Sequence, residues 1–202
     1  MSFRLVDEGE FGFGWTIEER YARTSHALAA GGQVWLVDPV DVDGLDDRVR
    51  ALGAPAGVIQ LLDRHNRDCA VIAARVGVPH HVVPESLPGT PFEFVRVARI
   101  PRWHEVALWW PEGRVLVCAD ALATIGFFTA GGGAAGVHPF LRLAPPQRLA
   151  TLEPLHLLVG HGAGLHGEET AETVRSAIAT ARTGLPRWAA RIARSTVRAR
   201  RR

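Results

Sequence analysis

The chain has 202 residues, 47% of them hydrophobic and 22% charged, so it can bury a sizeable core, and this composition predicts a globular protein and excludes a disordered chain. All its cations are arginine and they are unevenly placed: residues 182–202 hold eight arginines and no acid, whereas residues 1–181 hold fifteen arginines against twenty-one acids. No apolar run is long enough to span a membrane, and no apolar signal stretch follows the N-terminus. Two cysteines do not make a disulfide framework. Together these features predict a cytoplasmic protein.

Short apolar and β-branched runs bounded by turn residues predict strands at residues 2–7, 25–30, 33–37, 58–62, 82–83, 94–98, 105–110, 114–118 and 155–159. Amphipathic spacing predicts helices at residues 44–52, 66–76, 147–152 and 168–182, and a basic helical tail at residues 185–202. Residues 126–146 are rich in glycine and proline and are predicted to form a long loop. This order of elements fits an α/β (α+β) fold with two mixed sheets and helices outside them.

Polar side chains follow three of the predicted buried strands, at the point where each strand ends. The segment LLDRHNRDC (61–69) follows GVIQ, Asp120 follows RVLVC, and His161 follows LHLLV between two glycines. The carboxyl ends of strands are a usual place for sites in α/β proteins, so these side chains are expected to lie together.

The order and spacing of these segments resemble the metallo-β-lactamase fold family. The resemblance extends over nearly the whole chain and implies a four-layer αββα sandwich. It also implies one domain at residues 1–184, followed by a basic Arg-rich C-terminal tail at residues 185–202. The tail is expected not to be needed for folding, because it adds self-repelling charge and few apolar groups.

The family's metal loop has the pattern His-x-His-x-Asp-His, and the resemblance places Arg64 and Asn66 where its first two histidines would stand. A third family histidine falls near Pro101 and is also missing, which implies one divalent ion at most. The ligands that the resemblance leaves are Asp68, Cys69, Asp120 and His161.

Carboxylate, thiolate and imidazole groups all suit zinc. Four protein ligands would make a structural site, whereas turning Cys69 away would leave a position for a water nucleophile, with Asp68 and Asp120 in the catalytic site. Other interpretations stay open. Asp68 suits the start of a helix, Cys69 suits a small buried position, and Asp120 suits a helix cap.

Two arginines and one histidine flank these ligand positions. Arg64 and Arg67 are expected either to pair with the acids and fill the former metal site or to bind an anionic substrate. His65 is expected to point away from the ligands, as a neighbouring or surface residue that takes part in anion binding.

The favoured hypothesis is therefore a divergent hydrolase that uses zinc or another divalent metal, one ion at most, on a small ester, thioester, amide or phosphoester. The alternative is a non-catalytic, metal-free protein whose site is closed by arginine salt bridges or binds a small anion. A third hypothesis, a nucleic-acid-associated module, rests on the basic tail alone. The sequence leaves the enzyme status, the substrate and the oligomeric state open.

Overall fold

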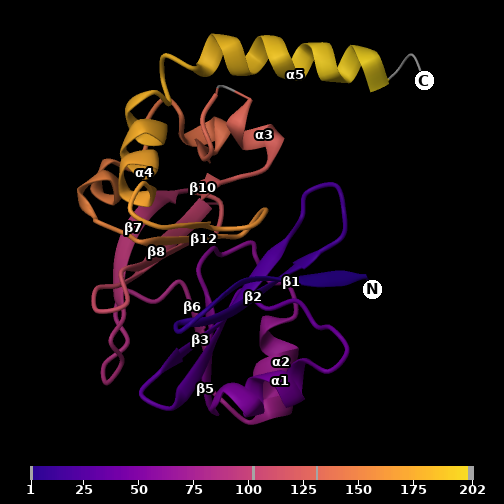
Figure 1. Cartoon of the computed structure of the whole chain (residues 1–202), viewed down its shortest axis with the longest axis vertical. Coiled ribbons are helices and arrows are strands. Elements are labelled where there is room, and N and C mark those ends of the chain that lie inside the picture. The colour runs from indigo at the N-terminus through magenta and orange to yellow at the C-terminus, as the bar shows by residue number, and fades with distance from the viewer. Residues whose placement is uncertain (1, 102, 131, 200–202) are drawn as a thin grey trace.

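A computed structural model describes residues 2–101, 103–130 and 132–199. Its first sheet has the strand order β1-β2-β3-β4-β5-β6. The bounds are β1 Phe3–Gly9, β2 Gly12–Ile17, β3 Thr24–Ala30, β4 Gln33–Val37, β5 Ala54–Gln60 and β6 His80–Val82. Helices α1 (Leu45–Leu52) and α2 (Cys69–Val76) cover its outer face (Figure 1).

The second sheet has the order β13-β12-β9-β8-β7. Its strands are β7 Glu93–Ile100, β8 Trp103–Trp110, β9 Val115–Cys118, β12 His156–Val159 and β13 Leu165–His166. Helix α4 (Thr170–Ala179) buries Val174 and Ile178 in the same core as this sheet. The prediction of two mixed sheets with helices outside them is confirmed.

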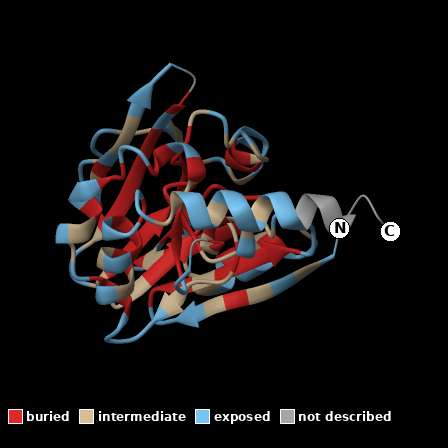
Figure 2. Cartoon of the chain, turned by 90° about the horizontal axis from the view of Figure 1, so that it is seen from above, coloured by how far each residue is buried: buried red, intermediate tan, exposed pale blue. Residues whose placement is uncertain are grey.

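Side-chain alternation along the first sheet explains why it carries layers on both faces. In β4, Val34 and Leu36 belong to the core under α1 and α2, whereas Trp35 and Val37 face the second sheet. A strand with period two and apolar residues at every position must be covered on both sides. Figure 2 shows the resulting buried interior, with exposed residues concentrated on the outer helices and loops.

The structure contains regular elements that the sequence patterns do not predict. Strand β2 is one of them, because Gly12 and Gly14 interrupt its apolar run. A Cβ on Gly12 would lie 1.9 Å from the carbonyl oxygen of Ala27, so glycine permits the close pairing of β2 with β3. Residues 126–146 also contain regular structure, namely α3 (Gly126–Thr129), β11 (Gly136–Val137) paired with β10 (Leu122–Ala123), and a 3₁₀ turn at Pro139–Leu141.

The basic tail forms helix α5 (Leu185–Ala199), which lies over α3 in Figure 1. Trp188 fastens it: the indole nitrogen donates to the carbonyl of Phe127 at 2.6 Å, and the two rings meet edge to face at 5.6 Å between centroids. Residues 200–202 of the predicted tail lie outside the described residues. No helix in the described part of the chain is long and apolar enough to cross a membrane.

Candidate metal centre

The two sheets bring the ends of four strands to one edge of the molecule. Strands β9 and β12 are parallel neighbours in register, with Cys118 beside Val159. Asp120 and His161 therefore leave adjacent strands at the same end. Strands β4 and β5 of the other sheet are also parallel, and they bring Asp38 and the loop 61–68 to this edge.

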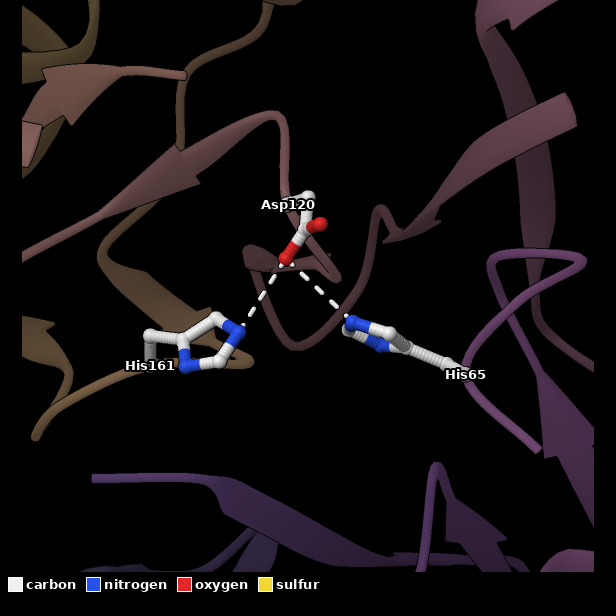
Figure 3. Close-up of side chains that lie close together, drawn as sticks. All are labelled: His65, Asp120 and His161. Atoms are coloured by element: carbon white, nitrogen blue, oxygen red, sulfur yellow. Dashed lines mark ion pairs between the residues drawn. The ribbon is translucent and has the colours of Figure 1, made fainter. Parts of the chain in front are cut away.

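His65, Asp120 and His161 meet at this edge (Figure 3). One carboxylate oxygen, Oδ1 of Asp120, lies 3.3 Å from Nε2 of His65 and 3.2 Å from Nε2 of His161. The three potential ligand atoms all lie within 4.8 Å of one another. In the part of the chain that the structure describes, no other three histidine, cysteine, aspartate or glutamate side chains bring their ligand atoms this close together.

The geometry fits a small divalent cation. Asp120 Oδ1 is buried yet accepts no hydrogen bond, although two imidazole nitrogens are within 3.3 Å. Around a tetrahedral zinc ion with ligand bonds of about 2.0–2.1 Å, neighbouring ligand atoms lie about 3.3–3.4 Å apart. The two short separations match that spacing, and two imidazoles with one carboxylate suit zinc or iron(II) while leaving a position open.

Both imidazoles are oriented by the nitrogen that faces away from Asp120. Nδ1 of His65 lies 3.1 Å from Oδ2 of Asp38, and Nδ1 of His161 lies 2.7 Å from the carbonyl oxygen of Tyr21. Each acceptor favours the proton on Nδ1, which leaves the lone pair of Nε2 directed at the shared centre. A metal-binding histidine is typically held in this way.

Asp38 and Glu105 are buried carboxylates that sequence reasoning missed. Asp38 fixes the loop through a second bond, because its Oδ1 accepts the amide of Leu61 at 3.0 Å. Glu105, on β8, accepts the amides of Asp120 and Ala121 at 2.8 and 2.7 Å. Burial raises the pKa of Glu105 to about 7. Asp38 directly follows the apolar run of β4, so the rule that selected Asp120 would also have found it.

Charge in the group is strongly coupled. Burial and Arg67 lower the pKa of His65, but contacts with Asp120 and Asp38 outweigh them and raise it to about 9. Burial alone would raise the pKa of Asp120, but the adjacent His161 and His65 rings more than reverse this effect and hold it well below its usual range. Without a metal, a proton on His65 therefore compensates the carboxylates at neutral pH.

The structure separates Asp68 and Cys69 from this group. Asp68 precedes α2, and its carboxylate accepts the amide of Asp41 at 2.8 Å. Cys69 is fully buried against the core under α2, and burial raises its pKa to about 12, so it remains a thiol. His65 instead points inward, contrary to its expected direction.

The two arginines have different surroundings. Arg64 is partly exposed; its Nη2 lies 3.5 Å from Asp120 Oδ2 and its Cζ lies 3.9 Å from the centre of the Trp103 ring. Arg67 points inward, and its guanidinium donates to the carbonyl oxygens of Thr24, Asp38 and Gly160 at 2.5, 2.7 and 3.1 Å. Arg67 therefore links three strand ends, while Arg64 lies beside Asp120 with a partly exposed guanidinium group.

No family model matches the chain, and no curated protein matches its sequence. Solved structures do match. The DIM-1 metallo-β-lactamase exposed to ceftazidime aligns over 90% of this chain and 98% of its own, with a TM-score of 0.57 at 12% identity. The FIM-1 metallo-β-lactamase from Pseudomonas aeruginosa in its mono-zinc form aligns over 90% and 97%, with a TM-score of 0.54 at 11% identity.

A third structure, TTHA1623 in a di-iron-bound form, aligns over 75% of this chain and 92% of its own, with a TM-score of 0.52 at 18% identity. Identities this low establish the architecture and leave the activity open. Together with the observed sheets and helices, these matches show that the chain has the metallo-β-lactamase fold.

Proposed function

We propose that the protein is a hydrolase that uses one divalent metal ion held by His65, Asp120 and His161. The observation that supports this most directly is the buried Asp120 Oδ1, which accepts no hydrogen bond between two imidazole nitrogens at 3.2 and 3.3 Å. The proposal keeps the sequence expectation of a single ion but exchanges Asp68 and Cys69 for His65. The favoured substrates remain small esters, thioesters, amides or phosphoesters.

When bound, a divalent metal would supply a Lewis acid and lower the pKa of a coordinated water. The chain's own residues have separate tasks. Asp38 and the Tyr21 carbonyl hold the imidazoles in position, and Glu105 fixes the segment that bears Asp120. Arg64 lies beside Asp120 and is partly exposed, and its guanidinium N–H groups would suit a negatively charged substrate oxygen.

Metal binding is the first test. Zinc titrated into metal-stripped protein, followed by calorimetry, should bind at one site per chain. His161→Ala should remove that binding, because two ligands would remain. His104→Ala is the matched control, since His104 is exposed and pairs with Asp63 outside the centre. Equal zinc affinity in both variants would reject the assigned ligands.

Turnover is the second test. Hydrolysis of p-nitrophenyl acetate and p-nitrophenyl phosphate should depend on added metal and disappear in Asp120→Asn. Turnover by stripped protein that equals turnover by zinc-loaded protein would contradict the proposal.

A specific observation favours a second candidate, a metal-free centre closed by charge. Arg64 lies 3.5 Å from Asp120, and the raised pKa of His65 supplies another positive charge. In this alternative the protein does not turn over substrate and binds a small anion beside Arg64. A failure to bind zinc, together with one-to-one phosphate binding that Arg64→Gln removes, would favour it over the hydrolase.

A further inference from the structure

A cavity of about 400 Å³ lies between the loop after β2, helix α3 and helix α5. A volume of this order is within the range of small-molecule sites. Its lining includes two arginines, two aromatic residues and two isoleucines, namely Arg20, Tyr21, Ile125, Phe127, Arg191 and Ile192. Arg191 and Ile192 belong to α5, so this helix forms one side of the cavity.

The cavity is connected to the metal centre through Tyr21 and through the segment Phe127–Phe128. The carbonyl of Tyr21 holds Nδ1 of His161 at 2.7 Å, while the Tyr21 side chain lines the cavity and meets Phe127 edge to face. The next residue, Phe128, stacks on His161 with 6.0 Å between ring centroids. Tyr21 and Phe128 thus connect the wall of the cavity to one of the proposed ligands.

The lining is apolar with positive charge at its edge. Aromatic and aliphatic side chains form most of the wall, and the two charged groups among the described lining residues are both guanidinium groups. Arg20 lies over the Tyr21 ring at 5.3 Å, which fixes one charge at the rim. Glu19, the nearest acid along this loop, is paired with Arg23. An anionic occupant would pair with these two exposed guanidinium groups, whereas a neutral or cationic occupant would not.

We propose that this cavity binds the apolar, anion-bearing part of the substrate, namely an alkyl or aryl group that carries a carboxylate or phosphate. The assignment of this ligand as a substrate rests on the proposed function, but the binding itself does not. Arg20 and Arg191 would hold the anion through charge-assisted hydrogen bonds, and the wall of Ile125, Phe127 and Ile192 would cover the apolar group.

Gly126 offers a way to fill the cavity without changing its charge. It lines the cavity as the first residue of α3, and a Cβ built on it meets no heavy atom within 4 Å. Gly126→Leu should therefore fit the fold and occupy the space of the apolar group.

Binding can be measured on the full-length, metal-stripped protein by calorimetry with octanoate, octyl phosphate, octylamine and octanol. Octanoate or octyl phosphate should bind at one site per chain. The one that binds more tightly shows whether the site prefers a carboxylate or a phosphate. Arg191→Gln should weaken this binding about tenfold, equivalent to about 1.4 kcal/mol. Arg194→Gln, an exposed change on the same helix, should leave it unchanged. Gly126→Leu should abolish binding while retaining the unfolding temperature.

Octylamine or octanol binding as tightly as the anions would overturn the inference, and so would equal effects of the two arginine variants. These outcomes are independent of metal chemistry. Loss of zinc-dependent turnover with intact anion binding would reject the proposed hydrolase alone, whereas zinc-dependent turnover that octanoate and octyl phosphate do not inhibit would reject the cavity as its substrate site.

Discussion

Asp38→Asn tests whether the buried carboxylate orients a metal ligand. Asp38 uses both oxygens, because Oδ1 accepts the Leu61 amide at 3.0 Å and Oδ2 lies 3.1 Å from Nδ1 of His65. An amide of the same shape has a single acceptor oxygen, so either Leu61 or His65 must face an NH₂ group. A buried donor left without an acceptor costs about 1–3 kcal/mol.

Asp38→Asn should weaken zinc binding by more than a loss of folding stability alone would. Removing the acceptor beyond a metal-bound histidine typically weakens metal affinity about 10–100-fold. Zinc calorimetry on the stripped variant should therefore show one site with a Kd raised by about that factor. Asp46→Asn is the matched control, since this surface acid pairs with Arg75 away from the centre. Unchanged zinc affinity in Asp38→Asn would refute the orienting role.

Three further predictions follow from the same contacts. Because a proton and the metal compete for Nε2 of His65, zinc affinity should rise about tenfold per pH unit up to about pH 9, where His65 loses its proton; a flat profile would contradict this. Arg67→Ala should lower the free energy of unfolding by at least about 2 kcal/mol, because three carbonyls lose a charged donor, whereas Arg64→Ala should change it by less than about 1 kcal/mol in a urea titration. Burial lowers the pKa of His138 to about 4. The stability that the neutral His138 ring provides is therefore present above about pH 6.5 and is lost as the pH falls through 4. In thermal melts, His138→Gln should reduce the loss of stability across that window.

Much of the fold was accessible from the sequence because its signals are local. The hairpin of β3 and β4 follows from Gly31-Gly32, both of which adopt positive φ angles, as a two-residue hairpin turn requires. The runs of β5, β9 and β12 are apolar at successive positions because layers cover both faces. Strand β2 was hidden because its glycines serve pairing with β3, a contact that no local pattern records.

The candidate site was predictable in part. The strand-end rule selected Asp120 and His161, which the structure brings within 3.2 Å. His65 was expected to point away because it lies between Arg64 and Asn66, the two positions that the resemblance aligns with family ligands, whereas its ring lies 3.3 Å from Asp120. The residues just before α2 form a loop in which Arg67 has a positive φ of 41°, so no regular periodicity sets the side-chain directions there.

Glu105 illustrates a part of the site that the sequence could not reveal. It lies within a strand of apolar neighbours, where a single acid gives no signal of its partners. Its role depends on the amides of Asp120 and Ala121, which are distant in sequence and reach it only when β8 and β9 pair. Such long-range placement follows from the completed sheet.

Anomalous scattering at the zinc edge, from crystals of full-length protein grown with zinc, can show whether His65, Asp120 and His161 hold one metal ion. One peak per chain is expected, about 2 Å from Nε2 of His65, Nε2 of His161 and a carboxylate oxygen of Asp120. The peak should be absent in His161→Ala crystals grown in the same way. Two peaks per chain, a peak at Asp68 and Cys69, or no peak at saturating zinc would contradict this assignment.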